Sequence, residues 1–147
     1  MADELSSNEV QLVVFRLDRE EYGIDILMVQ EIKKMTEITR VPHTPDYIKG
    51  VMNLRGSVLP VLDLKLRLGL PPGNTTDDTR IVIVKNGDVA VGMLVDSVSE
   101  VLGISRDKIE PPQNVGGMIS ENYLSGVGKL DNRLLILLDI HNTININ

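Results

Sequence analysis

Two histidines and two aspartates are the residues best suited by type to acid–base chemistry. Neither His43 nor His141 has a second imidazole or a carboxylate at metal-ligand spacing, and no nucleophile accompanies either at a readable spacing. Asp63 and Asp139 each follow an apolar segment and precede a possible helical turn, where a carboxylate accepts hydrogen bonds from free N–H groups. We therefore interpret both aspartates as helix caps and predict no catalytic residue and no metal site.

Glycine-rich loops and cysteines, which often form cofactor, metal or catalytic sites, give no sign of such a site here. The segments 69–73 and 116–117 lack the lysine of a phosphate-binding loop and the glycine spacing of a dinucleotide site. The sequence contains no cysteine, which rules out disulfides and thiolate ligands. We predict no cofactor.

Arg55 is the charged residue whose role the sequence leaves open. It lies in the stretch GVMNLRGSVLPVLDL (50–64), between two apolar arms that resemble the strands of a hairpin. An exposed arginine is ordinary in a turn, but its planar guanidinium also suits a partner's carboxylate or backbone. Spacing alone does not decide between these interpretations.

Composition restricts the partners and the compartment. The net charge of −6 repels a nucleic-acid backbone, and 3% aromatic residues provide little for base stacking, so no nucleic acid is expected. The apolar runs 89–95 and 134–138 are shorter than the ~18–20 residues of a membrane-spanning helix. The acidic start differs from a secretory signal. We predict a cytoplasmic protein without direct membrane insertion and with a disordered tail at residues 1–9.

The elements that must position these residues are mostly strands. The apolar segments are short, rich in Val, Ile and Leu, and separated by turn residues, which is typical of a small sandwich or barrel. Two short helices are predicted at 45–49 and 63–68, and a polar linker at 70–79. Strands are predicted at 10–17, 21–26, 31–34, 50–54, 57–62, 80–85, 89–95, 98–104, 126–130 and 133–138. The fold class is therefore all-β with short helices.

An internal repeat divides the chain into two copies, roughly 10–69 and 79–141. The segment 47–64 matches 123–140 at a constant offset of 76 (123 − 47). A weaker match upstream keeps a glycine, a valine and a glutamate at an offset of 69 (92 − 23). Each copy is small for an isolated core, so we expect the two to pack together, with strand exchange between them left open.

Comparison of the two copies shows which residues of the Arg55 hairpin are shared and which are found only in the first copy. The apolar arms and Asp63 recur in the second copy, and so does Gly50. Arg55 and Gly56 do not recur, because Asp131 and Asn132 take their places. The duplicated fold therefore does not require Arg55.

A resemblance to a known family rests on five motifs in a fixed order. EEYGIDILMVQEI, ITRVPHTPDYIKGVMNLRGSVLPVLDL, GMLVDSVSEVL, KIEPP and YLSGVGKLDNRLLILLDI resemble the CheW family of bacterial chemotaxis adaptors over about residues 10–141. NLRG, followed by an apolar strand and an aspartate, is the most diagnostic piece. The resemblance implies one CheW-like domain over 10–147, built of two small five-stranded SH3/OB-like β-barrel subdomains that share a hydrophobic core.

The resemblance also implies a function and two partners. A protein of this family is a non-enzymatic adaptor, without a cofactor, that couples chemoreceptors to the chemotaxis histidine kinase in membrane-associated signalling arrays. The groove between the barrels would receive the cytoplasmic tip of a methyl-accepting chemoreceptor, and one barrel would contact the regulatory domain of the kinase. The implied receptor-binding residues are Val29, Glu31, Gly50, Arg55 and Gly56, and the implied kinase-binding residues are Val13 and Ile26.

Two alternatives stay open. The same module resembles part of adaptors that carry a receiver domain, although the sequence ends at Asn147, which favours a freestanding adaptor. A small β-barrel enzyme or ligand carrier that uses Asp63, Asp139 or His43 is the alternative from another class.

Overall fold

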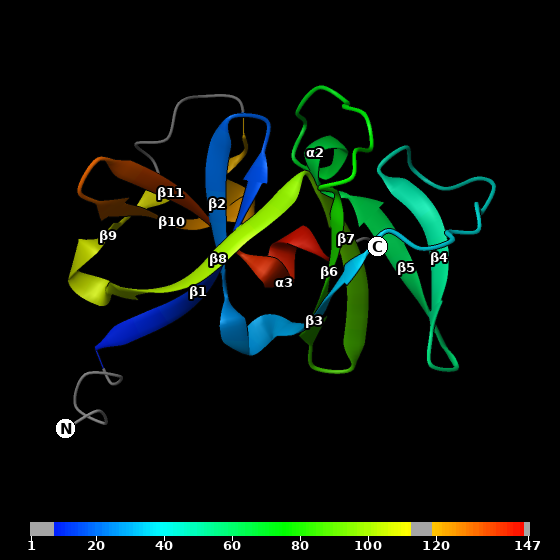
Figure 1. Ribbon diagram of the computed structural model, residues 1–147, viewed down its shortest axis with the longest axis horizontal. Coiled ribbons are helices and arrows are strands. Elements are labelled where there is room, and N and C mark those ends of the chain that lie inside the picture. The colour runs from blue at the N-terminus through cyan, green and yellow to red at the C-terminus, as the bar shows by residue number, and fades with distance from the viewer. Residues whose placement is uncertain (1–7, 113–118, 146–147) are drawn as a thin grey trace.

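The computed structural model describes residues 8–112 and 119–145 (Figure 1). Most of them lie in strands, joined by tight turns and short helical segments. The strands are Glu9–Leu17 (β1), Glu20–Asp25 (β2), Val29–Lys34 (β3), Ile48–Leu54 (β4), Ser57–Asp63 (β5), Arg80–Asn86 (β6), Val89–Val95 (β7), Ser97–Ser105 (β8), Ile109–Glu110 (β9), Leu124–Leu130 (β10) and Arg133–Leu138 (β11). The α-helices are Leu64–Arg67 (α2) and Ile140–Thr143 (α3), and the 3-10 turns are Ile26–Met28 (η1), Arg106–Lys108 (η2) and Glu121–Tyr123 (η4).

The strands form two sheets that lie side by side in Figure 1. The first sheet has six strands in the order β8-β1-β2-β11-β10-β9, and the second has five in the order β3-β6-β7-β5-β4. When the repeat copies are aligned, β1, β2, β8, β10 and β11 of the first sheet correspond to β6, β7, β3, β4 and β5 of the second. The hairpin β1–β2 therefore lies in the sheet of the second copy, and β6–β7 lies in the sheet of the first copy.

This arrangement confirms the all-β fold class and shows the strand exchange that the repeat left open. Each exchanged hairpin joins its host sheet through a parallel pair, β2 with β11 in the first sheet and β7 with β5 in the second. The other pairs are antiparallel. The two copies thus build each other's sheets.

Two sequence predictions were wrong in detail. The first sheet has a sixth strand, because the two residues of β9 pair with β10, and a segment this short carries no readable periodicity. The helix predicted at 45–49 is absent, since Ile48 and Lys49 already belong to β4 and Ile48 N–H donates to Pro45 O at 3.0 Å in a turn. A single helical turn is too weak to compete with pairing along a strand.

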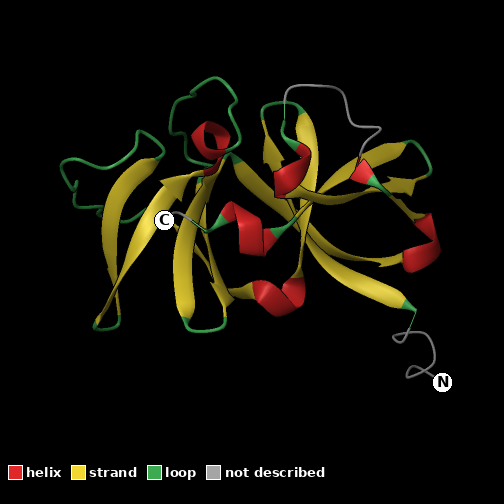
Figure 2. Cartoon of the chain, turned by 180° about the vertical axis from the view of Figure 1, so that it is seen from behind, coloured by secondary structure: helices red, strands yellow, loops and turns green. Residues whose placement is uncertain are grey.

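Alternate residues of β1 point into different hydrophobic cores. Val13, Phe15 and Leu17 belong to the largest cluster, which draws side chains from both sheets, whereas Leu12 and Val14 belong to a cluster within the first sheet. Each of these side chains is at most 2% exposed. The second sheet encloses a third cluster of its own. The shared core expected from the repeat is therefore present, and α3 lies beside it between the two sheets (Figures 1 and 2).

The outer edge of the second sheet is joined to the segment that follows β3. Thr39 and Val51 of β4 form an antiparallel bridge with two N–H···O bonds of 2.8 Å. Gly50 has φ of +147°, and a β-carbon there would overlap the carbonyl group of Thr39. The repeat reproduces this contact in the first sheet, where Gly126 of β10 lies against the backbone of Glu110 in β9. Gly50 is therefore required by the fold.

We predict that Gly50→Ala lowers the free energy of unfolding by about 2–4 kcal/mol, because the new methyl group displaces the Thr39 backbone and strains φ. Urea denaturation followed by circular dichroism measures the loss. Gly56→Ala is the matched control, since Gly56 also has a positive φ of 91° but nothing lies within 4 Å of the added carbon. Its cost should stay at about 1–2 kcal/mol, because only the positive φ is strained. Equal losses in the two variants would contradict the close contact at Gly50.

Candidate functional site

Arg55 and Glu31 form an ion pair between the two outermost strands of the second sheet. Arg55 follows β4 in the β4–β5 turn, and Glu31 lies on β3, at the opposite end of the strand order. Nη1 of Arg55 donates to Oε1 of Glu31 at 3.5 Å, and Nη2 approaches Oε2 more closely. The curvature of the sheet thus brings together two residues that are 24 positions apart in the sequence.

The backbone at Arg55 adopts a conformation that is unusual for an arginine. Its φ is 50°, followed by Gly56 at 91°, and the Gly56 N–H donates to Asn53 Oδ1 at 2.9 Å. A left-handed residue other than glycine costs about 1–2 kcal/mol. The equivalent residue of the second copy, Asp131, has φ of 46° and belongs to a type that tolerates this region better. Backbone strain at an arginine favours a function for its side chain.

Both members of this pair are charged at neutral pH and remain accessible. Hydrogen bonds and charge from Arg55, with a smaller effect of Lys33, outweigh partial burial and hold the pKa of Glu31 below its usual 4.5. The side chain of Arg55 is 67% exposed and that of Glu31 is 25% exposed. An exposed ion pair contributes little to stability. The Arg55–Glu31 pair therefore presents two opposite charges in a fixed arrangement at the surface.

The other residues predicted to bind a receptor are placed differently. Gly56 is exposed beside Arg55 in the same turn. Val29 is half-buried and packs against the shared core, and Gly50 is buried against Thr39. The close approach that the glycine was predicted to allow is made by the chain's own backbone. Glu31, Arg55 and Gly56 therefore form the accessible part of this set.

The two residues predicted to bind a kinase also differ. Val13 is 1% exposed within the shared core, so its side chain is out of reach of any partner while the domain is folded. Val13 was chosen by family resemblance, which carries no information on exposure, and both faces of β1 are covered at this position. Ile26 is half-buried in η1, next to Leu27, which is 87% exposed. Sequence reasoning missed Leu27, because apolar residues within an apolar run do not reveal which one faces solvent.

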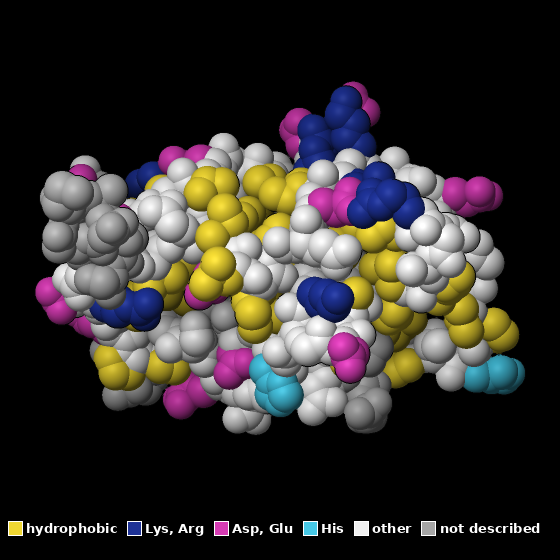
Figure 3. All heavy atoms as spheres, turned by 90° about the horizontal axis from the view of Figure 1, so that it is seen from below, with side chains coloured by type: hydrophobic (Ala, Val, Ile, Leu, Met, Phe, Trp, Pro, Cys, Tyr) yellow, Lys and Arg dark blue, Asp and Glu magenta, His cyan; other side chains and the backbone are white. Residues whose placement is uncertain are grey.

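A groove beside Arg55 was also missed. It has a volume of about 580 Å³, lies along β5 and the start of β7, and its lining includes Gln30, Val58, Lys85 and Val89. Val58 is 66% exposed and Val89 is 53% exposed. In the space-filling view, hydrophobic side chains are exposed at several places on the face shown, among scattered charged groups (Figure 3). Exposed apolar side chains beside an oriented charge pair are typical of a protein-binding surface.

The first sheet carries a second ion cluster around an arginine. Arg133, at the start of β11, donates through Nε and Nη2 to both carboxylate oxygens of Glu21 at 3.0 Å, and through Nη2 to Glu100 Oε2 at 2.7 Å. Glu100 is the repeat equivalent of Glu31 (100 − 31 = 69). Arg133 corresponds in position to Ser57, not to Arg55 (133 − 76 = 57). Each copy therefore pairs this glutamate with an arginine from the β4–β5 or β10–β11 hairpin, but from different positions.

The pKa of Glu21 predicts a pH dependence of stability. The hydrogen bond from Arg133, opposed by burial and aided by the charges of Arg133 and Arg16, keeps this pKa below 4.5. A lowered folded-state pKa contributes stability that is present above the unfolded-state value and is lost as pH falls through the folded-state value. Arg133→Met should therefore lower the free energy of unfolding at neutral pH and reduce its further fall between about pH 5 and pH 3.

Urea denaturation at each pH measures this effect. Lys129→Met is the control, because it removes an exposed pair with Glu110 at 3.1 Å, in which the two side chains are 58% and 43% exposed. The free energy of unfolding of Lys129→Met should fall with decreasing pH as it does in the unmodified protein. If the free energy of unfolding changes with pH in the same way in Arg133→Met and in the unmodified protein, Arg133 does not lower the pKa of Glu21 and the prediction is wrong.

Three of the four residues considered for acid–base chemistry have hydrogen-bond partners. Asp63 accepts from Leu66 N–H at 3.3 Å and caps α2, and Asp139 accepts from Asn142 N–H at 3.0 Å and caps α3. The capping interpretation is therefore confirmed. His43 is exposed in a turn with φ of 63°, and His141 Nδ1 lies 2.7 Å from Nδ2 of Asn86. Within residues 8–112 and 119–145, no group of three or more His, Cys, Asp or Glu side chains is arranged to hold a metal ion.

The duplicated pair of strand-exchanged sheets, with an oriented charge pair and exposed apolar side chains, defines a β-rich protein-binding module. A family model described as "CheW-like domain" matches residues 11–146. The chain is 44% identical over 131 residues to a chemotaxis protein CheW of Klebsiella aerogenes, covering 88% of this chain and 78% of the relative. It is 37% identical to a chemotaxis protein CheW of Bacillus subtilis, covering 95% and 88%.

A solved structure agrees with these relatives. The crystal structure of the scaffolding protein TtCheW from Thermoanaerobacter tengcongensis superposes with a TM-score of 0.86 at 39% identity, covering 94% of this chain and 89% of that one. The chain therefore belongs to the CheW family of chemotaxis scaffold proteins. No helix in the described part of the chain is long and apolar enough to cross a membrane.

Proposed function

We propose that this protein is a non-enzymatic adaptor that couples methyl-accepting chemoreceptors to the chemotaxis histidine kinase at membrane-associated arrays. The observation that carries the proposal is the exposed Arg55–Glu31 pair at the rim of the second sheet, beside the groove lined by Val58 and Val89. Membership of the CheW family supports the same assignment. The cytoplasmic location follows from the partners and is part of the proposal.

The receptor contact is proposed at Glu31, Arg55 and Gly56. The receptor tip is a helical hairpin, and a helix is recognised by an apolar trough with a few charges that set its register. The guanidinium group has five N–H donors, of which the pair with Glu31 engages two, so Arg55 can bind a further acceptor on the partner. Val29 and Gly50 would contribute by shaping the strands behind this surface, since one is half-buried and the other buried.

We predict that Arg55→Ala weakens binding of a receptor cytoplasmic-tip fragment by about 1–3 kcal/mol, with little change in folding, because an accessible charged anchor is lost. Isothermal titration measures the affinity, and circular dichroism monitors the fold. Arg55→Lys should recover only part of the binding, since lysine lacks the planar fork. Arg19→Ala, at an exposed position in the β1–β2 turn, is the matched control. Unchanged affinity in Arg55→Ala would remove Arg55 from the receptor surface.

The kinase contact is proposed at η1. Ile26 of this turn packs against the shared core and Leu27 projects from it, which supplies an apolar contact on a rigid base. The resemblance to the CheW family implies that the regulatory domain of the kinase is a module of the same kind, so the proposed contact is one β module against another. Val13 is left out of this surface because it is buried.

We predict that Leu27→Asp weakens binding of the kinase regulatory domain by about 2 kcal/mol or more, since a charge replaces an exposed apolar anchor. Surface plasmon resonance with the isolated regulatory domain measures the change, and binding of the receptor fragment is measured in parallel. Val101→Asp is the control, because Val101 is also exposed, at 51%, but lies on β8 of the first sheet. Loss of receptor binding with kinase binding intact would reassign η1 to the receptor.

A further inference from the structure

The short helix α2 carries two cations that reach from the second sheet to parts of the first. It directly follows β5 of the second sheet, and Leu64 at its start packs in the shared core. Lys65 and Arg67 follow this apolar anchor, and each binds groups on segments that adjoin strands of the first sheet. α2 is also seen at the junction of the two sheets in Figure 1.

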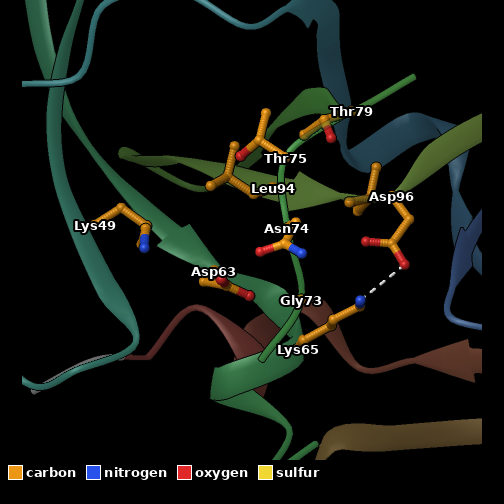
Figure 4. A pocket seen from close by; sticks show the side chains of 10 residues that line it. Lys49, Asp63, Lys65, Gly73, Asn74, Thr75, Thr79, Leu94 and Asp96 are labelled. Atoms are coloured by element: carbon orange, nitrogen blue, oxygen red, sulfur yellow. Dashed lines mark ion pairs between the residues drawn. The ribbon is translucent and has the colours of Figure 1, made fainter. Parts of the chain in front are cut away.

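Lys65 forms an ion cluster with two aspartates. Its Nζ lies 2.8 Å from Asp18 Oδ1 and 3.0 Å from Asp96 Oδ2, and Asp18 N–H donates to Asp96 Oδ2 at 2.7 Å. Asp18 belongs to the β1–β2 turn, and Asp96 joins β7 of the second sheet to β8 of the first. Figure 4 shows Lys65 extending from α2 toward Asp96. Among the ion pairs of the described residues, this cluster is the one that joins the two sheets.

Lys65 remains charged although its side chain is only 9% exposed. Burial lowers its pKa, but hydrogen bonds and charge from Asp18 and Asp96 outweigh burial and raise the pKa above 10.5. The ammonium group has three N–H donors, and here two carboxylates from different segments hold it at 2.8 and 3.0 Å. The cluster can therefore fix geometry as well as proximity.

Arg67 forms a second link of a different kind. Its guanidinium carbon lies 4.7 Å from the ring centre of Tyr47 and 5.1 Å from that of Tyr123, two residues that the repeat makes equivalent (123 − 47 = 76). Nε donates to Thr143 O at 2.8 Å, and Nη2 donates to Asn145 O at 2.7 Å and Asn142 O at 3.3 Å. Arg67 thus joins both copies and holds the end of α3.

We propose that Lys65 and Arg67 are positioning residues that fix the angle between the two sheets. The apolar contact between the sheets is non-directional, whereas these hydrogen bonds restrict relative rotation. The corresponding positions of α3 are His141 and Thr143 (65 + 76 and 67 + 76), so the second copy lacks both cations. At the position equivalent to Lys65, His141 instead lies 2.7 Å from Asn86 of β6, so the ion cluster and the arginine contacts are features of α2 alone.

The consequence for partner binding rests on the proposed function. The Arg55–Glu31 pair lies on the second sheet, whereas the turn η1 with Leu27 lies between β2 of the first sheet and β3 of the second. A rigid angle between the sheets would hold these two surfaces in one relative orientation. A domain without the clamp would lose part of its binding free energy in ordering the sheets on each encounter.

The angle can be measured without any partner. Because the chain has no cysteine, Asp88→Cys in the β6–β7 turn and Asn132→Cys in the β10–β11 turn introduce one spin label on each sheet. Pulsed electron–electron double resonance then gives the distribution of distances between the two spin labels. We expect one narrow distribution in the labelled protein and a broader or shifted one after Arg67→Met or Lys65→Met.

Arg80→Met is the matched control, because Arg80 is also partly buried and donates to backbone oxygens, but only within its own segment, to Asp77 O and Thr79 O at 2.9 Å. It should leave the distribution unchanged. If Arg67→Met fails to fold, the label distances are measured in Arg67→Lys and Lys65→Met instead. Arg67→Lys keeps the charge but not the planar guanidinium group. Distributions in the folded variants that match the control would overturn the clamp and leave the apolar core as the sole determinant of the angle.

Binding distinguishes this inference from the proposed function. Receptor-fragment affinity should fall about three- to tenfold in Lys65→Met, which lies outside the proposed contact surface. A broadened label distribution together with a normal response to Arg55→Ala but no loss of affinity in Lys65→Met would overturn the link between angle and binding. An unaltered affinity in Arg55→Ala would count against the proposed receptor site alone, because the label distances do not depend on it.

Discussion

Burial on both faces of the central strands is the constraint on which the rest of this structure depends. Val13 and Phe15 of β1 point into the core shared by the two sheets, while Leu12 and Val14 point into the core of the first sheet. A copy of about sixty residues has too little apolar surface to satisfy both demands alone. Exchange of the hairpins β1–β2 and β6–β7 meets them, because each copy then supplies the missing wall of the other sheet.

The accessible surface follows from that constraint. With both faces of the exchanged hairpins covered, solvent-facing positions remain chiefly at the rims, turns and outer strands. Arg55, Leu27, Val58 and Val89 all occupy such places. The strands that bear the shared core hold these positions rigidly, and a rigid surface loses less conformational entropy when a partner binds. A module of this kind can therefore present different contacts from each sheet without changing its core.

Much of the fold could be predicted from the sequence, and the site only partly. The short apolar strands and the repeat were readable because they depend on local chemistry and on direct comparison of segments. The two residues of β9 were too short to carry a pattern. Val13 was chosen by family resemblance, which does not tell whether a further layer covers its side chain, and the side chain is buried. Glu31 and Arg55 were chosen by family resemblance, and only the curvature of the sheet brings them into contact.

The two copies show how a duplicated fold can take on unequal roles. Gly50 and Gly126, like Asp63 and Asp139, recur because each solves the same backbone problem in both sheets. The glutamates Glu31 and Glu100 also recur, but their arginine partners come from different positions of the hairpin. Arg55 comes from the strained position of its turn, is 67% exposed and faces one carboxylate, whereas Arg133 is 37% exposed and is shared between two. The pairing that is less satisfied internally is the one with donors left for a partner, which is a physical reason to place binding on the second sheet.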